Sequence, residues 1–404
     1  MTRLKSVGTL CDGRSWARWN EALGQRYTLG VEEEVMLLEP QTWSLAESSD
    51  TVLPRLSSQL STHVAPETHA AVVEIVTGVH PHVDEVVAEL GLLRRRLAGE
   101  LAEMGLSVAA AGTHPTSALR ETEVSGAARY RLLGESLRGL ARRQPTMSLH
   151  VHVGVPTPED AVRVLNGLRE HLPVLLALSA NSPFCDGRDG GFDSLRTVIF
   201  QAFPRTGAPR TFAGYADYIE AVDALVAPGA IPDPSFLWWD ARLQPALGTV
   251  EVRVMDAQSS VRDVAPLVAL VQALAHLALE GDGRSAGADD QVLAENRFLA
   301  ARDGMAARLI DSRTRRLIPI RETLQELLAS CRPHALALRC EGKLERVRSL
   351  AAANGAKRQR AFSGGLGGLV ERLAQQFLSG TRTLAAEGAT AVSLASAAER
   401  SGTT

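Results

Sequence analysis

Alternating polar and apolar positions predict β-strands in four segments of the chain. Two of them read Gly30-Val-Glu-Glu-Glu-Val-Met-Leu-Leu and Ser148-Leu-His-Val-His-Val-Gly. The others read Thr249-Val-Glu-Val-Arg-Val-Met-Asp and Ala70-Ala-Val-Val-Glu-Ile-Val-Thr. Each is rich in the apolar and β-branched residues that favour strands. Because residues two apart on a strand point to the same face, these segments predict a sheet with one charged face.

Apolar residues at helical spacing predict helices between and after the strands. Asp84 to Met104 predicts an amphipathic helix. A second helix should begin at Pro158 and run to about Ala180, because proline suits the first turn and the acids that follow favour a helix N-terminus. Asn181 to Arg196 is a loop rich in Gly and Asp, and the pattern from Val261 onward is almost wholly helical.

One sheet must gather charged pairs that are spread from the first tenth of the chain to past its middle, which favours one large α+β domain. We expect residues 1–26 to form an N-terminal extension that docks through Trp16 and Trp19. Residues 27–384 form the functional domain, and residues 385–404 form a tail with a last, fraying helix. The predicted strands run from Tyr27 to Glu39, Val72 to Thr77, Ser107 to Ala111 and Met147 to Val155, with another around Glu251.

Composition excludes several classes of protein. The 404 residues are 45% hydrophobic and 22% charged, as in an ordinary globular protein. A net charge of −3, from 43 basic and 46 acidic residues, indicates neither a nucleic-acid partner nor a polybasic membrane surface. The four scattered cysteines lack metal-ligand spacing and indicate reduced thiols.

No segment predicts secretion or a membrane span. The N-terminus lacks the apolar core of a signal peptide. The longest apolar stretch, Val264 to Leu279, is interrupted by polar residues and falls short of the ~20 residues that a spanning helix needs. We therefore expect a buried core helix at this position and a cytoplasmic protein.

The charged face of the predicted sheet is the candidate site. It should collect Glu32, Glu34, Glu74, His150, His152, Glu251 and Arg253. Glu33 should point to the opposite face, so that Glu33→Gln would be nearly silent. Each motif alone has an ordinary interpretation: a solvated edge strand, hydrogen-bonded core histidines, or a structural ion pair. Together they indicate a site, because burying several charges is costly unless a cation or an ionic substrate pairs them.

The donor types indicate which cation and which ligand to expect. Four or more carboxylates with a histidine suit Mg²⁺ or Mn²⁺ better than Zn²⁺. Such Mg²⁺ sites usually also hold nucleotide phosphates. The chain has neither a Gly-x-x-x-x-Gly-Lys-Ser/Thr loop nor a Gly-x-Gly-x-x-Gly motif after a strand. A nucleotide would therefore be held through metal ions and arginines.

A longer series of motifs resembles one known family. The series comprises Gly30 to Val35, Pro66-Glu67, Val73 to Val79, His150 to Val155, Asn181 to Arg196, Trp239 to Arg242, Thr249 to Asp256, Glu295 to Gly304 and Gly355 to Arg360. Their order and spacing resemble the glutamate–cysteine ligase type 2 family, the bacterial ATP-dependent carboxylate–amine ligases. The resemblance runs from about Tyr27 to Thr381, so it makes residues 27–384 the ligase domain.

The resemblance implies a fold related to that of glutamine synthetase, in which a curved antiparallel sheet forms a funnel and helices pack outside it. It places Mg²⁺ or Mn²⁺ at Glu32, Glu34, Glu74, His150 and Glu251. Glu34 and Glu67 look like the acids of a second metal or of the substrate side.

The same resemblance implies roles for the remaining polar residues. Arg253 matches the arginine that meets the phosphates of ATP. Arg196 is expected to hold a substrate carboxylate or phosphate, and His152 has a supporting role at most. The chain departs from the family pattern at Asp189-Gly-Gly-Phe192, where relatives commonly carry two hydroxyl groups, and this departure could alter substrate contact.

The implied reaction is ATP-dependent formation of an amide of the γ-glutamyl type through an acyl phosphate. The expected partners are a small acid and a small amine, with glutamate and cysteine as the reference pair, and a homodimer is left open. Two other classes are kept as alternatives. A metal-dependent amide hydrolase could use the histidines and acids to activate water, and a non-catalytic homologue could bind nucleotide without turnover.

Overall fold

Strand β1 (Leu29–Leu38) is the centre of a seven-stranded antiparallel sheet in the computed structural model, which describes residues 14–117, 122–281 and 289–380. The strands follow the order β10-β11-β5-β1-β3-β2, and β4 pairs with residues 36–38 of β1 on the edge opposite β3, beyond the end of β5. The remaining strands are β2 (Val64–Pro66), β3 (Val72–Val76), β4 (Ser107–Ala109), β5 (Ser148–Gly154), β10 (Ala241–Gln244) and β11 (Thr249–Asp256).

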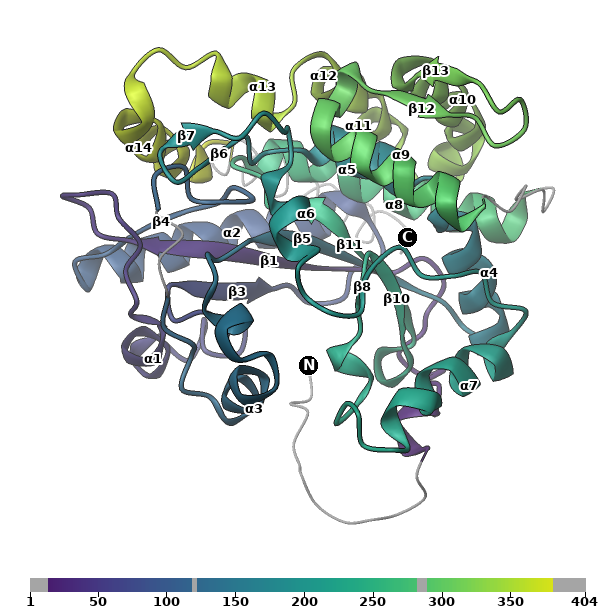
Figure 1. Ribbon diagram of the computed structural model, residues 1–404, viewed down its shortest axis with the longest axis horizontal. Helices are drawn as coiled ribbons and strands as arrows, with labels where there is room; N and C mark the ends of the chain where they lie inside the picture. The colour runs from purple at the N-terminus through teal and green to yellow at the C-terminus, as the bar shows by residue number, and fades with distance from the viewer. Residues whose placement is uncertain (1–13, 118–121, 282–288, 381–404) are drawn as a thin grey trace, which may run out of the picture.

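Helices form a layer on one face of this sheet (Figure 1). Helix α2 (Val83–Glu103) packs against β1, α5 (Leu172–Ser179) against β11, and α8 (Val261–Glu280) against β5. Helices α3 (Ala128–Leu137) and α7 (Tyr215–Val226) lie at the lower left and lower right of Figure 1, on either side of the central strands. The arrangement agrees with the predicted sheet with helices packed outside.

The other helices are α1 (Ser49–Val52), α4 (Pro158–Arg169), α6 (Leu195–Phe200), α9 (Asp290–Asp303), α10 (Ile320–Ala337), α11 (Glu341–Glu345), α12 (Val347–Ala352), α13 (Gly355–Arg360) and α14 (Gly365–Phe377). Short strand pairs are β6 (Phe184–Cys185) with β7 (Arg188–Asp189), β8 (Thr206–Gly207) with β9 (Trp238–Trp239), and β12 (Arg308–Ile310) with β13 (Leu317–Pro319).

Two predictions about local structure were wrong. The helix expected from Pro158 to Ala180 is two helices, α4 and α5, because Pro173 lacks an N–H and its ring clashes with the carbonyl of Arg169. The loop from 181 to 196 contains the β6–β7 hairpin and the start of α6. Among the described residues, the region after Val261 is almost wholly helical, as predicted, apart from the β12–β13 hairpin, in whose turn the Thr314 N–H donates to Asp311 at 2.6 Å.

The prediction that the N-terminal segment docks on the body is confirmed for the described residues. Trp19 is buried, and its indole N–H donates to the carbonyl of Val155 at 3.1 Å. Trp16 is partly buried against the hydrophobic core. Residues 1–13 and the predicted tail, 385–404, lie outside the described residues.

Helix α8 contains the long apolar stretch. With 20 residues, it is long and apolar enough to cross a membrane by length and composition alone. However, 67% of its most apolar window is buried inside the protein, where it packs against α2, α4 and α10. This environment agrees with the prediction of a core helix.

Glu33 is turned away from the charged face, as predicted, but it is fully buried. Arg94 of α2 donates to both of its carboxylate oxygens, with the Nε contact at 2.8 Å. The same guanidinium donates to the carbonyls of Gln258, Ser259 and Phe377 at 2.7, 3.3 and 3.3 Å. One ion pair therefore joins β1 to α2, to the segment after β11 and to α14.

Glu33→Gln should lower the free energy of unfolding by about 3–5 kcal/mol, because it leaves the buried Arg94 without its anionic partner. The expectation from sequence of a nearly silent substitution therefore fails for stability. Urea denaturation measures the effect, with Glu103→Gln on the exposed face of α2 as the matched control. Equal unfolding free energies for the two variants would contradict this assignment.

Candidate active site

The register of four strands assembles the charged face of the sheet. On β1, Glu32 lies opposite His150 of β5, and on the other side of β1, Glu34 lies opposite Glu74 of β3. His152 of β5 lies opposite Glu251 of β11. The sequence segments that carry these residues are far apart in the chain, and the pairing of the strands brings them onto one surface, as the two-residue spacing predicted.

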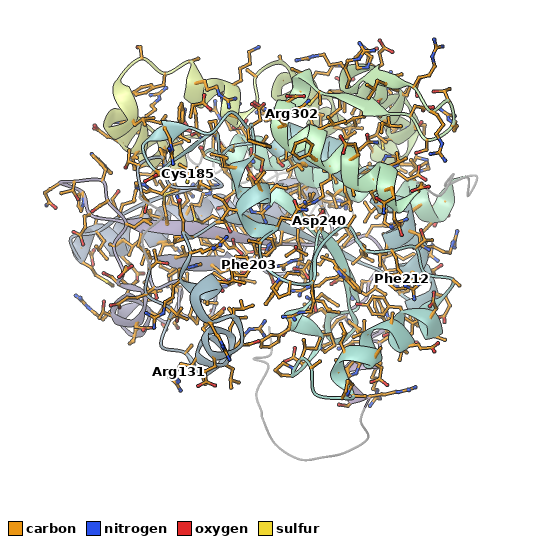
Figure 2. The ribbon with its side chains drawn as sticks, viewed as in Figure 1. Arg131, Cys185, Phe203, Phe212, Asp240 and Arg302 are labelled. Carbon is orange, nitrogen blue, oxygen red and sulfur yellow. The ribbon has the colours of Figure 1, made fainter. Side chains whose placement is uncertain are left out.

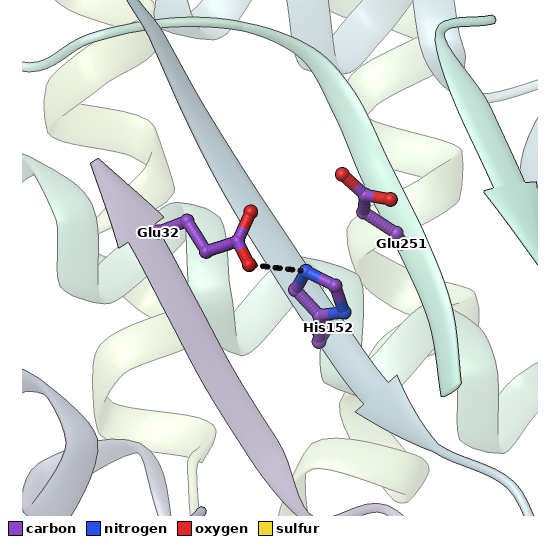
Figure 3. A group of neighbouring side chains, drawn as sticks. All are labelled: Glu32, His152 and Glu251. Carbon is purple, nitrogen blue, oxygen red and sulfur yellow. Dashed lines mark ion pairs between the residues drawn. The ribbon is translucent and has the colours of Figure 1, made fainter. Parts of the chain in front are cut away.

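Among the described residues, three overlapping groups of side chains could each hold a metal ion. Within each group the ligand atoms lie within 4.8 Å of one another. Figure 3 shows the first group, in which side chains from three neighbouring strands converge. The groups are Glu32 with His152 and Glu251, Glu32 with Glu74 and His150, and Glu34 with Glu67 and Glu74.

The acids of the third group lack sufficient positive charge around them. Burial raises the pKa of Glu74 well above its usual value, and Glu32, Glu67 and Glu34 raise it further. Burial, followed by the charge of Glu67, raises the pKa of Glu34 to about 7. These shifts are what like charges in a buried position produce, so this end of the site calls for a cation.

Glu251 is in the opposite situation. Burial acts to raise the pKa of Glu251, but Arg242 and Arg253 hold this pKa well below its usual value. Its Oε2 accepts from Nε of Arg242 and from Nε2 of Gln244, both at 2.6 Å, and its Oε1 accepts from Arg253. Arg242 was missed by sequence reasoning, although it ends the Trp239 to Arg242 motif and directly pairs with Glu251 across β10 and β11.

The two histidines lie on either side of Glu32. Nδ1 of His150 is 3.2 Å from one Glu32 oxygen, and Nε2 of His152 is 3.4 Å from the other. Burial and the nearby Arg253 lower the pKa of His150 to about 4, so it is neutral and able to act as a ligand. Nε2 of His152 is buried without a hydrogen-bond partner. The structure thus brings His152 into a candidate metal group, beyond the supporting role expected for it.

Glu67 follows β2 and reaches the site from the edge of the sheet. Its oxygens accept from the hydroxyl of Thr68 at 2.7 Å and from the hydroxyl of Tyr130 at 3.3 Å. Tyr130 lies on α3 and also donates to the carbonyl of Pro66 at 2.8 Å. Sequence reasoning missed Tyr130, because nothing in the local pattern of α3 shows that it lies beside β2.

Arg196 and the Asp189 loop lie in surroundings that the sequence did not indicate. The guanidinium of Arg196 donates to the backbone carbonyls of Arg253 and Val254 at 3.0 and 3.1 Å. The carboxylate of Asp189 accepts from Nε of Arg360 at 2.7 Å, which ties the loop to α13. The side chains of Arg196 and Asp189 therefore already contact other groups of the same protein.

The residues present fit divalent cations. Oxygen ligands dominate, as Mg²⁺ and Mn²⁺ prefer. The raised pKa of Glu74 shows a carboxylate that a bound cation would stabilise, and Nε2 of His152, which makes no hydrogen bond, is 3.4 Å from Glu32. The predicted ligands Glu32, Glu34, Glu74, His150 and Glu251 all belong to at least one of the three groups.

Comparison with known proteins decides the family. The chain matches the model described as "Glutamate-cysteine ligase family 2" over residues 28–375. It belongs to this family. This match confirms the predicted family. Membership of the family supports the general activity of an ATP-dependent ligase.

Relatives in the family match most of the chain. Two are from Rubrobacter xylanophilus and bear the names "Putative glutamate--cysteine ligase 2-1" and "2-3". The first is 41% identical over 83% of this chain and 89% of the relative. The second is 39% identical over 86% of this chain and 96% of the relative. A family member from Thermobifida fusca is 35% identical over 88% of this chain and 92% of its own.

Solved structures show the fold. The glutamate–cysteine ligase of Francisella tularensis, solved in complex with AMP, has a TM-score of 0.63 at 15% identity and covers 93% of this chain and 94% of its own. The bifunctional glutathione synthetase of Pasteurella multocida has a TM-score of 0.61 at 13% identity, covering 89% of this chain and 53% of its own. The predicted α+β fold class is confirmed.

Glu74→Gln should raise the melting temperature of the metal-free protein by a few degrees, because it removes a buried acid whose ionised form the neighbouring carboxylates destabilise. It should also reduce the further rise that Mn²⁺ produces in the wild type, because a ligand is lost. Thermal melts in EDTA and in Mn²⁺ measure both effects, with the exposed Glu371→Gln as control. A variant that melts below the wild type in EDTA would contradict the charge-repulsion argument.

Proposed function

We propose that the protein is an ATP-dependent carboxylate–amine ligase that joins the γ-carboxylate of glutamate to the amine of cysteine. The observation that carries the proposal is the convergence of five carboxylates and two histidines in three overlapping groups, beside two buried arginines. Membership of the glutamate–cysteine ligase family 2 supports the choice of substrates.

A carboxylate is a poor acyl donor, so the reaction needs two steps. In the first, a carboxylate oxygen attacks the γ-phosphorus of ATP, the bond to the bridging oxygen breaks, and ADP leaves. In the second, the amine nitrogen attacks the acyl carbon, the bond to the phosphate oxygen breaks, and phosphate leaves while the nitrogen loses a proton. Phosphoryl transfer depends on positioning and on neutralising charge at the phosphate oxygens, and it requires no nucleophile from the protein.

The residues divide into three roles in this proposal. The metal ions would be held by Glu32, Glu34, Glu74, His150 and Glu251, with His152 beside them. When bound, Mg²⁺ or Mn²⁺ supplies charge neutralisation at the phosphates. Arg253, which Glu251 and His150 hold at the edge of the groups, binds phosphate oxygens. Glu67, at the far end, attracts the protonated amine on the substrate side.

Two alternative functions would give different experimental results. A metal-dependent amide hydrolase would act without ATP and would favour Zn²⁺. A non-catalytic homologue would bind nucleotide but release no ADP. The buried arginines beside the acids favour the ligase, because attack by a metal-bound hydroxide has no need of a phosphate-binding guanidinium.

Purified protein should release ADP in the presence of glutamate, cysteine and Mg²⁺ or Mn²⁺, and EDTA should abolish the release because phosphoryl transfer requires the ions. A coupled ADP assay with mass spectrometry of the product tests this, extended to other acids and amines. Glu32→Gln should abolish turnover and leave the fold intact, whereas Glu371→Gln should not. Amide hydrolysis without ATP would establish the hydrolase, and nucleotide binding without ADP release the non-catalytic homologue.

Arg253→Lys should reduce kcat by about 10²- to 10³-fold, with a smaller change in the apparent affinity for ATP. Guanidinium can bind two phosphate oxygens with one planar fork, whereas ammonium is a point charge. Steady-state kinetics and a thermal melt separate this role from a structural one. If Arg253 only neutralised Glu251, the variant would keep the wild-type kcat and melt at a lower temperature.

A further inference from the structure

Strand β11 is irregular at the point where Arg253 enters the site. Two residues of β11, Arg253 and Val254, face one residue of β5, His150, because the register shifts between Val252 and Met255. Such a bulge takes backbone groups out of the ladder and changes the direction of a side chain. It follows that the direction of the Arg253 side chain depends on whatever holds the bulge in place.

Arg196 supplies the missing hydrogen-bond donors. Its two terminal nitrogens donate to neighbouring carbonyls, NH1 to Val254 at 3.1 Å and NH2 to Arg253 at 3.0 Å. The side chain is 6% exposed, so neither carbonyl could turn to bulk water at low cost. A planar guanidinium can serve two adjacent acceptors at once, which an ammonium group cannot do in the same geometry.

Arg196 is itself held rigidly at the start of α6. Its guanidinium lies 5.7 Å from the ring centre of Phe200 and 3.9 Å from a carboxylate oxygen of Asp256. Asp256 in turn accepts from the hydroxyls of Ser182 at 2.6 Å and Ser194 at 2.9 Å. This network fixes the position of the donors relative to the end of β11.

The bulge is held from the other side as well. The N–H of Arg253 donates to the carbonyl of Asp240 at 2.7 Å, and Asp240 lies near the centre of the molecule (Figure 2). The carboxylate of Asp240 accepts from Nε and NH2 of Arg297 at 2.5 and 3.1 Å. The backbone of Arg253 is therefore held through both its N–H and its carbonyl, and the side chain of Arg196 contacts the carbonyl.

We infer that Arg196 is a positioning residue, which fixes the bulge of β11 so that the fork of Arg253 points at the transferred phosphoryl group. It acts through Arg253 and does not hold a substrate anion, which replaces the role expected for it from the sequence. The inference rests on the proposed function, because it assigns the phosphoryl group as the target of Arg253.

A double-mutant cycle with Arg196→Lys, Arg253→Lys and the double variant tests the inference. Arg196→Lys should lower kcat by about 10- to 100-fold, as expected for a small misplacement of a catalytic group. The KM for the acid substrate should stay nearly unchanged. In the Arg253→Lys background the same substitution should cost little, because residues that act through each other are not additive.

Arg169→Lys is the matched control for loss of a buried arginine that binds backbone. Arg169 lies on α4, outside the site, and its Nε donates to the carbonyl of Pro209 at 2.5 Å. This control should melt at a lower temperature without coupling to Arg253. An additive cycle, or a raised KM for the acid with wild-type kcat, would make Arg196 an anion holder. Wild-type kinetics with a lower melting temperature would make it merely structural.

The experiment also separates this inference from the proposed function. A wild-type protein that releases no ADP with any acid and amine refutes the ligase, and the cycle is then measured by calorimetry on the binding of a non-hydrolysable ATP analogue, which keeps the γ-phosphoryl group, with Mn²⁺. The two arginines should remain coupled in that measurement. Additive losses of affinity, or no binding of the ATP analogue by the wild type, would overturn the positioning role.

Discussion

The two-residue period of β1 makes the strand carry charge on both of its faces, and the surrounding structure treats the two faces differently. Glu33 points into the helix layer, where Arg94 neutralises it completely. Glu32 and Glu34 point to the opposite face, where they join further acids. Because Arg94 is a fixed cation, the face that carries Glu33 has a structural role. The face that carries Glu32 and Glu34 has too few fixed positive charges for its acids, so it can bind metal ions together with a ligand.

Positive charge on the open face is distributed unevenly, and this unevenness gives the site a direction. Arg242 and Arg253 are both engaged with Glu251 at the β11 end. At the β3 end, burial and mutual repulsion raise the pKa of Glu74 and of Glu34. The β3 end therefore has the greatest demand for cations, and the β11 end is where the proposed function has fixed guanidinium groups bind phosphate.

The argument from two-residue spacing and the resemblance to a known family point to the same candidate site residues. The spacing in four segments predicted which side chains share a face, and the strand register bears this out. The family match over residues 28–375 was predictable from the order of the motifs. Contacts between distant segments were not predictable: Arg94 with Glu33, Tyr130 with Glu67, and Arg196 with the backbone of β11. Each of these pairs joins residues more than 50 positions apart.

The sequence by itself determined the strands β1, β3, β4, β5 and β11, the helix α2 and the face on which the acids and histidines lie, because periodicity is a local property that the backbone geometry imposes. It also determined the family. Only the tertiary structure decided that Glu33 is buried, that His152 joins a candidate metal group, and that β11 carries a bulge at Arg253. These features depend on which segments pack together and on how buried charges and backbone groups find partners, and a local pattern does not contain that information.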